Sequence, residues 1–232
     1  MSVNGVVYVV DDEETVRRSV ARLVRSVGLR AETFPSVPAF LAHKVDDSPA
    51  CLVLDVRLPG QSGLDLQAAL GESQRSLPII FITGRGNVPM SVRAMKGGAL
   101  DFLQKPFDSQ QLLDSIQRAL ASSREGRAAE TERAAVERRL ATLTPREREV
   151  LKLVVKGLLN KQIAGELGAA EKTVKVHRGR VMRKMEADSV ADLVRMAQTA
   201  GLDAPSVVPR DYADRTKTRH SQARTRGPML SQ

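Results

Sequence analysis

Cysteine and aromatic residues are scarce in this chain of 232 residues. Cys51 is its single cysteine, tryptophan is absent, and the aromatic content is only 3%. One cysteine excludes a disulfide framework and suits a reducing compartment. Hydrophobic residues still make up 42% of the chain, which is enough for one or two packed cores at this length.

Long apolar runs are also missing. No run approaches the roughly 18 consecutive apolar residues that a membrane-spanning helix needs. The first residues, MSVNG, lack the basic segment and the apolar stretch of a secretory signal. We therefore expect a cytoplasmic protein that has no membrane partner.

Positive charge is unevenly distributed along the chain, which has 36 basic and 27 acidic residues. Residues 1–122 hold 13 of each sign, whereas residues 142–202 hold 12 basic and 7 acidic residues. We expect a neutral module at 1–122, a linker at 123–141, a basic module at 142–202 and a basic, disordered tail at 203–232. A basic module of this kind is typical of proteins that bind a polyanion.

Short apolar runs alternate with helical patterns in the first module. The runs end near Val10, Phe34, Asp55, Thr83 and Leu103, and the segments between them place apolar residues at helical spacing. Alternation of this kind predicts an α/β fold, with a doubly wound, five-stranded parallel sheet of the flavodoxin-like kind. We expect the second, smaller module to be all α.

Residues suited to phosphoryl chemistry stand where these runs end. Asp11 and Asp12 follow the first run, Asp55 and Thr83 end two others, and Lys105 follows the last. The carboxyl ends of parallel strands share one edge of a sheet, so the five side chains should meet. Three neighbouring carboxylates repel one another unless a cation intervenes, and a hard ion such as Mg²⁺ is their natural partner. One carboxylate can then attack a phosphoryl group whose charge the cation neutralises.

Residues 6–121 resemble the receiver domain of two-component response regulators. The resemblance implies that Asp55 accepts a phosphoryl group from a sensor histidine kinase and that Thr83 and Lys105 contact it. The implied ligands of Mg²⁺ are the carboxylates of Asp11, Asp12 and Asp55 and the backbone carbonyl of Arg57.

The resemblance also implies a switch made by Thr83 and Phe102. In such receivers the threonine moves toward the phosphate and the aromatic ring turns inward, which alters the face made by the fourth helix, fifth strand and fifth helix. The position of Phe102 is often tyrosine in the family, so a hydroxyl is missing here. Lys105-Pro106 matches a peptide bond that is usually cis.

Two arginines, Arg57 and Arg85, follow Asp55 and Thr83 by two residues each. One interpretation is that their guanidinium groups change the lifetime of the acyl phosphate by excluding or misplacing water. The other is that both are solvated loop cations, and the sequence leaves the choice open.

The expected linker has no proline and is rich in Ala, Glu and Arg, which favours a helix interrupted only by Gly126. It lacks a sustained apolar seam, so we do not expect a coiled coil. Signal transmission and passive tethering are both open as its role.

Four short helices are expected in the second module. Thr144, Pro145 and Glu147 have the pattern of a helix start with a capping box, and Gly157 supplies the stop. Further helices are expected at about 160–167, 171–185 and 190–199. The small turn between the second and third predicts a helix-turn-helix.

The third of these helices separates into two faces. Its expected core stripe comprises Val174, His177, Val181 and Met185. A second stripe comprises Lys172, Lys175, Val176, Gly179 and Arg183. A stripe of lysine and arginine can contact phosphates and base edges in the major groove, and one exposed valine can contact a thymine methyl group there. A solvated basic face is the alternative, but the adjoining turn and the regional charge favour DNA.

Three motifs within 143–200, LTPREREVL, NKQIA and KTVKVH, resemble the LuxR-type DNA-binding domain in its FixJ/NarL-type setting. The resemblance implies that Lys175, Val176 and Gly179 contact bases or the nearby backbone. Phosphate contacts are implied for Lys161, Lys172, Arg178 and Arg183. The turn at 168–170 departs from the family because it lacks the usual Ser or Thr cap, a loss of about 1 kcal/mol.

The sequence therefore predicts a response regulator that is not an enzyme: a phosphorylation-controlled transcription factor. We expect a homodimer on double-stranded DNA that activates transcription through RNA polymerase. Two alternatives are open, namely a phosphate-relay receiver whose basic module binds protein, and a regulator that binds DNA regardless of phosphate. The tail has two open roles, nonspecific DNA affinity and solubility.

Overall fold

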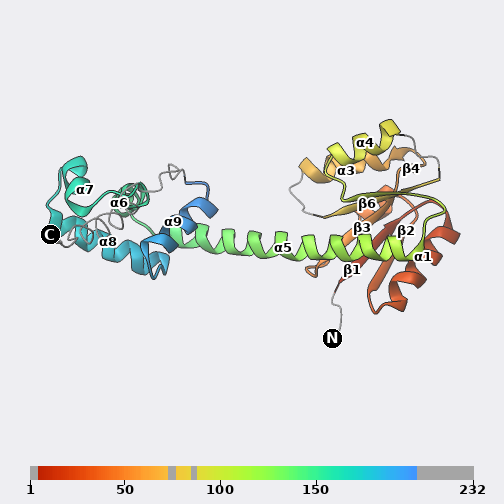
Figure 1. The fold of residues 1–232 in the computed structure, drawn as a ribbon, viewed down its shortest axis with the longest axis horizontal. Helices are drawn as coiled ribbons and strands as arrows, with labels where there is room; N and C mark the ends of the chain where they lie inside the picture. The colour runs from red at the N-terminus through yellow and green to blue at the C-terminus, as the bar shows by residue number, and fades with distance from the viewer. Residues whose placement is uncertain (1–4, 73–76, 85–87, 203–232) are drawn as a thin grey trace, which may run out of the picture. The chain divides into compact units, whose positions relative to one another are not determined.

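The computed structural model describes residues 5–72, 77–84 and 88–202, so Arg85 and the tail lie outside the described residues. The chain divides between Glu132 and Arg133 into two compact units (Figure 1). No helix of the described ranges is both long and apolar enough to cross a membrane.

The first unit is built on a five-stranded parallel sheet in the order β2-β1-β3-β6-β7. The strands are β1 (Val6–Val10), β2 (Arg30–Phe34), β3 (Ala50–Asp55), β6 (Ile79–Thr83) and β7 (Asp101–Gln104). Strand order reverses between β1 and β3, so the loops that follow these two strands flank the crevice where ligands bind in such sheets. The α/β fold class expected from the sequence is confirmed.

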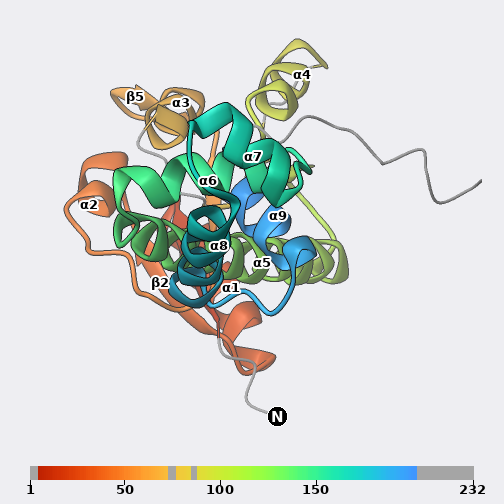
Figure 2. The same ribbon diagram turned by 90° about the vertical axis from the view of Figure 1, so that its left-hand side faces the viewer.

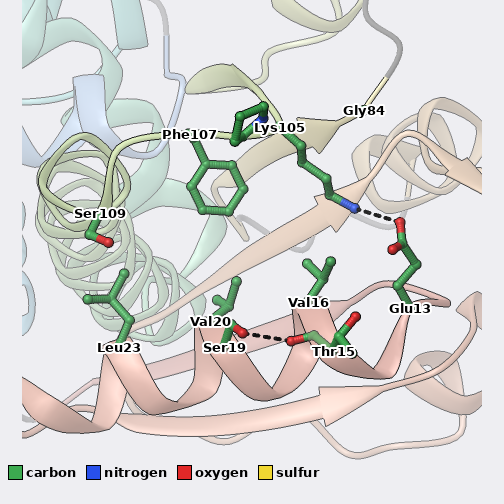
Figure 3. A pocket seen from close by; sticks show the side chains of 11 residues that line it. Glu13, Thr15, Val16, Ser19, Val20, Leu23, Gly84, Lys105, Phe107 and Ser109 are labelled. Atoms are coloured by element: carbon green, nitrogen blue, oxygen red, sulfur yellow. Dashed lines mark hydrogen bonds and ion pairs between the residues drawn. The ribbon is translucent and has the colours of Figure 1, made fainter.

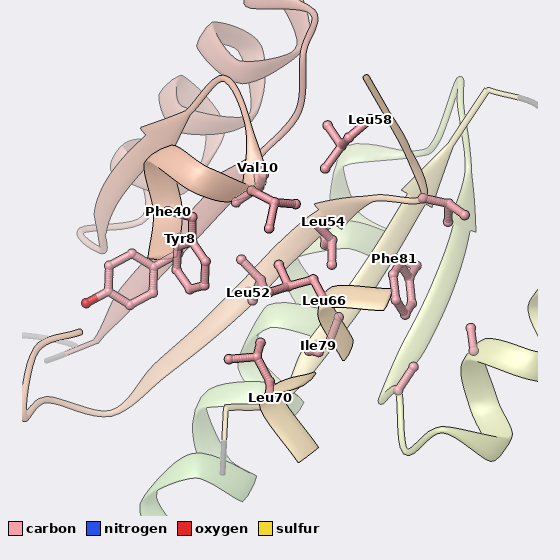
Figure 4. Close-up of a cluster of buried hydrophobic side chains, with 14 of the residues drawn as sticks. Tyr8, Val10, Phe40, Leu52, Leu54, Leu58, Leu66, Leu70, Ile79 and Phe81 are labelled. Carbon is pink, nitrogen blue, oxygen red and sulfur yellow. The ribbon is translucent and has the colours of Figure 1, made fainter. Parts of the chain in front are cut away.

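Helices cover both faces of this sheet. They are α1 (Glu14–Ser26), α2 (Val37–Leu41), α3 (Gly63–Glu72), α4 (Val88–Lys96) and the first part of α5 (Ser109–Ala141). Alternate residues of each strand point to opposite faces. Tyr8 and Leu52 pack toward α2 and α3 (Figure 4), whereas Val9 and Val53 pack toward α1 and α5. Burial of each large apolar side chain contributes about 1.5–3 kcal/mol.

A small antiparallel hairpin, β4 (Arg57–Leu58) and β5 (Gln61–Ser62), follows β3. The sequence gives no strand signal there, because strands of two residues are too short for an alternating pattern. Gly60 has φ +81 at the tip, a conformation that glycine adopts without strain.

Helix α5 runs for 33 residues and passes through Gly126 without a break. Its first part contributes Leu112, Ile116 and Leu120 to the core of the first unit. Its last part contributes Val136 to the core of the second unit. The segment expected as a linker, 123–141, is therefore divided between the two units.

The second unit contains α6 (Pro145–Val155), α7 (Asn160–Leu167), α8 (Glu171–Met185) and α9 (Val190–Thr199) (Figure 2). These helices share one apolar core. Thr144 and Glu147 form the predicted capping box at the start of α6. Gly157 and Gly168 have φ +84 and +59 where α6 and α7 end. The four expected helices are confirmed, and α7 and α8 form the helix-turn-helix.

Candidate functional sites

Three carboxylates meet where β1 and β3 end. Oxygen atoms of Asp11, Asp12 and Asp55 all lie within 4.8 Å of one another. Asp11 is fully buried and Asp55 is 5% exposed, whereas Asp12 is exposed. Hard carboxylate oxygens at such spacing are the donors that Mg²⁺ prefers, so the residues present fit this ion.

The ammonium group of Lys105 joins two of these carboxylates. Its Nζ lies 2.6 Å from Oδ2 of Asp11 and 2.8 Å from Oδ2 of Asp55, and 3.8 Å from a carboxylate oxygen of Glu13 (Figure 3). The Lys105-Pro106 peptide bond is cis. The ammonium group of Lys105 therefore compensates the negative charge of the two buried acids, which would be costly to bury unpaired.

Burial and pairing act in opposite directions on these groups. Burial is the largest influence on Asp11 and raises the pKa of its carboxyl, although its hydrogen bond with Lys105 opposes the rise. Burial works to lower the pKa of Lys105, but hydrogen bonds to Asp11 and Asp55 together raise it. Lys105 is therefore a charged donor at neutral pH.

Backbone groups orient the two buried carboxylates. Oδ1 of Asp11 accepts the N–H of Glu13, and Oδ1 of Asp55 accepts the N–H of Arg57, each at 2.9 Å. A Cβ atom at Gly63 would lie 2.4 Å from the backbone carbonyl oxygen of Asp55, so this position has no room for a side chain. The hairpin and α3 thus hold Asp55 closely.

Arg17 is a residue of this site that sequence reasoning missed. Its Nη1 donates to the backbone carbonyls of Asp11 at 2.7 Å and Asp12 at 2.8 Å. An arginine on an amphipathic helix gives no sign in the sequence that it turns back to the loop before the helix.

Thr83 and Phe102 lie on the neighbouring strands β6 and β7. Thr83 is fully buried at the end of β6, and its carbonyl accepts the N–H of Lys105 at 2.8 Å. Phe102 is half-buried, with its ring centroid 6.4 Å from that of Phe81. Thr83 therefore lies at the sheet edge that carries the site, whereas Phe102 pairs with Phe81 two residues before that edge.

A pocket of about 570 Å³ adjoins the acidic cluster, between α1 and the loop that joins β7 to α5 (Figure 3). Val16, Val20, Leu23 and Phe107 supply apolar walls, and Lys105 lines the end nearest the carboxylates. The acidic site thus opens beside an apolar surface.

A second candidate site is the exposed face of α8. Its exposed residues include Lys172, Lys175, Val176, Gly179 and Arg183, as well as Arg180. Val176 is 48% exposed. Val174, Val181 and Met185 are buried on the opposite side, as expected, but His177 is only half-buried. Its Nδ1 is the one buried side-chain polar atom without a hydrogen-bond partner in the described part of the chain.

Lys161 and Arg178, the other two residues predicted to contact phosphate, differ in exposure. Lys161 is exposed in the first turn of α7. Arg178 is half-buried, and its guanidinium donates to the side-chain oxygen of Asn160 at 3.1 Å, so it also ties α8 to α7. At the start of α7 the N–H of the N-cap residue Leu159 donates to the side-chain oxygen of Gln162 at 2.8 Å, whereas Ala170, the N-cap residue of α8, makes no side-chain capping bond.

Glu147 joins the first and third helices of this unit. Its Oε2 accepts the N–H of Thr144 at 2.9 Å and an ammonium hydrogen of Lys184 at 2.6 Å. The Lys184 ammonium, followed by the Thr144 N–H, lowers the pKa of Glu147 to about 2. The capping role is visible in the sequence, but the lysine partner 37 residues away is not.

Two family models match the chain. The response regulator receiver domain matches residues 7–117, and the luxR family of bacterial regulatory proteins matches residues 141–197. The two matches correspond to the two compact units described above.

Similar proteins cover nearly the whole chain. Nodulation protein W of Bradyrhizobium diazoefficiens is 52% identical over 203 residues, 88% of this chain and 89% of that protein. The transcriptional regulatory protein FixJ of Azorhizobium caulinodans is 44% identical over 210 residues, 90% of this chain and 97% of that protein. The solved structure of response regulator StyR has a TM-score of 0.73 at 47% identity, covering 84% of this chain and 99% of its own. The chain therefore belongs to the two-component response regulators of the FixJ type, in which a receiver domain precedes a LuxR-type DNA-binding domain, and it is a transcription regulator.

Proposed function

We propose that Asp55 is the phospho-acceptor and that a sensor histidine kinase is the donor. The observation that carries this proposal is the placement of the Asp55 carboxylate between a lysine ammonium and two further carboxylates at the sheet edge. The charge pattern suits a group that must receive a dianion beside a metal ion.

The transfer moves a phosphoryl group between two side chains. A carboxylate oxygen of Asp55 attacks the phosphorus atom while the P–N bond to the kinase histidine breaks. The electron pair of that bond leaves with the imidazole nitrogen, and Asp55 becomes an acyl phosphate. Lys105, already 2.8 Å from Asp55, pairs with a phosphoryl oxygen, and the Thr83 hydroxyl donates to another.

Mg²⁺ is the proposed cofactor, and when bound it neutralises negative charge on the phosphoryl oxygens. Its proposed ligands are the carboxylates of Asp11, Asp12 and Asp55 and the backbone carbonyl of Arg57. Lys105 keeps the two buried acids together before the ion arrives, since its ammonium contacts both.

The proposed output is pairing of two receivers, begun by Thr83 and Phe102. Helix α4 presents an exposed apolar stripe of Val88, Val92 and Met95 beside β7. These residues are 75%, 44% and 49% exposed, and a second copy of the same face would cover them.

Pairing would then bring two copies of α8 to a DNA element with two half-sites. Base or nearby backbone contacts are proposed for Lys175, Val176 and Gly179. Phosphate contacts are proposed for Lys161, Lys172, Arg178 and Arg183. We place this function in the cytoplasm and expect activation through RNA polymerase.

The decisive experiment compares DNA binding of the full chain with and without acetyl phosphate. Asp55→Asn removes the acceptor, and Asp65→Asn is a matched control because Asp65 is an exposed carboxyl on α3. We expect acetyl phosphate to strengthen binding of wild type and Asp65→Asn, but not of Asp55→Asn. Equal affinity in all cases would overturn phosphate control, and absence of DNA binding would favour a relay protein. Genome-wide footprinting of wild type against Asp55→Asn then identifies the targets.

A further inference from the structure

Arg17, in the first turn of α1, holds the loop that carries two of the three acidic residues. Its Nη1 donates to the backbone carbonyls of both Asp11 and Asp12, at 2.7 and 2.8 Å. The side chain is half-buried, and a charged donor makes these bonds stronger than bonds between neutral groups. One guanidinium nitrogen therefore fixes two successive peptide groups.

The two acids differ in what else holds them. The backbone N–H of Asp11 donates to Phe34 of the neighbouring strand at 3.2 Å, and its carboxylate binds Lys105. The exposed carboxylate of Asp12 makes no hydrogen bond or ion pair with any residue in the described ranges. Glu13, the N-cap residue of α1, makes no side-chain capping bond either. The peptide group between Asp12 and Glu13 is therefore held by two bonds, one from Arg17 to the Asp12 carbonyl and one from the Glu13 N–H to Oδ1 of Asp11 at 2.9 Å.

We propose that Arg17 is a positioning residue for the Mg²⁺ site. It sets the backbone at Asp12 so that this carboxylate lies beside those of Asp11 and Asp55. Lys105 holds the two buried ligands by their side chains, and Arg17 holds the exposed ligand by its main chain. The inference rests on the proposed Mg²⁺ site, and groups that orient metal ligands typically change metal affinity about 10–100-fold.

The test is the affinity of the full chain for Mg²⁺, measured by isothermal titration calorimetry. Arg17→Ala is compared with Arg18→Ala, because Arg18 is the next residue of the same helix and forms an exposed ion pair with Glu14. Asp12→Asn removes a proposed ligand, and Arg17→Lys keeps a cationic donor. Circular dichroism establishes that each variant is folded; if Arg17→Ala does not fold, Arg17→Gln replaces it with the same thresholds.

We expect Arg17→Ala to bind Mg²⁺ about 10-fold or more weakly than wild type, with Arg18→Ala unchanged and Arg17→Lys in between. Affinity of Arg17→Ala within twofold of wild type would overturn the inference, as would an equal loss in Arg18→Ala. If wild type and Asp12→Asn bind Mg²⁺ equally, the proposed metal site fails instead. A merely structural role for Arg17 would lower stability but leave the Mg²⁺ affinity of the folded protein unchanged.

Discussion

The hydroxyl of Ser123, on α5, accepts the backbone N–H of Ala50, the first residue of β3, at 3.1 Å. Both residues are buried, and they are 73 positions apart in the sequence. The bond satisfies a buried backbone N–H at the start of a central strand. Helix α5 therefore remains part of the receiver beyond residue 122, where the sequence suggested that the linker begins.

Ser123→Ala should lower the free energy of unfolding of the receiver by about 1–3 kcal/mol, because it leaves a buried N–H without a partner. Urea unfolding of the full chain measures the loss of stability. Hydrogen exchange of the β3 amides in the native protein locates it. Ser122→Ala is the control, since Ser122 is the exposed neighbour on the same helix. A similar small effect in both variants would contradict the prediction.

Lys105→Ala should destabilise the receiver without Mg²⁺ by about 3 kcal/mol or more, since it leaves Asp11 and Asp55 buried without their cation. Mg²⁺ should raise the thermal midpoint of this variant more than that of wild type, because the ion no longer competes with the ammonium. Lys44→Ala, at an exposed position, should behave as wild type. If Mg²⁺ raised the thermal midpoint of all three proteins equally, the ion and the Lys105 ammonium would not compete for the same carboxylates.

Glu147 should make the DNA-binding domain sensitive to acid. Its pKa is about 2 in the folded state and near 4.5 in the unfolded state, so its stabilisation is complete above pH 4.5 and is lost as the pH falls toward 2. Glu147→Gln should lower stability at pH 7 by about 1.5–3 kcal/mol and flatten the dependence in this window. Glu149→Gln is the control, since its ion pair with Arg146 is exposed. Unfolding curves between pH 7 and 2.5 give stability as a function of pH. If stability depended on pH equally in Glu147→Gln and wild type, Glu147 would not be the group responsible.

Lys172→Ala should reduce the salt dependence of binding to double-stranded DNA. Loss of one phosphate contact lowers the slope of log K against log salt by about 1. Lys152→Ala removes an exposed charge from α6 in the same domain and should leave the slope unchanged. Fluorescence anisotropy between 50 and 200 mM salt measures the slope for both variants. An equal decrease in the two slopes would mean that net charge, and not a contact from α8, sets the salt dependence.

The sequence predicted the elements that carry strong local signals. Strand ends at Asp55 and Thr83, the capping box at Thr144 and the stop at Gly157 were each visible because neighbouring residues determine them. The meeting of the acids with Lys105 followed from the topology of a parallel sheet.

What the sequence did not predict depends on partners far apart in the chain. Nothing local distinguishes Arg17 from the exposed Arg18, or Ser123 from Ser122. The interruption expected at Gly126 was wrong, because a single glycine costs a helix only about 1 kcal/mol and α5 continues through it to Ala141. Such pairings are determined by tertiary packing, which decides which side chains are buried and overrides local preference.

Helix α5 supplies buried side chains to two cores, ending with Ser123 in the first and beginning again with Val136 in the second. Between them, residues 124–135 contribute no fully buried side chain. Gene fusions that exchange the DNA-binding half of this regulator for another should therefore join the two parents inside this stretch. A junction at residue 122, the apparent domain border, would discard a hydroxyl that the receiver sheet uses.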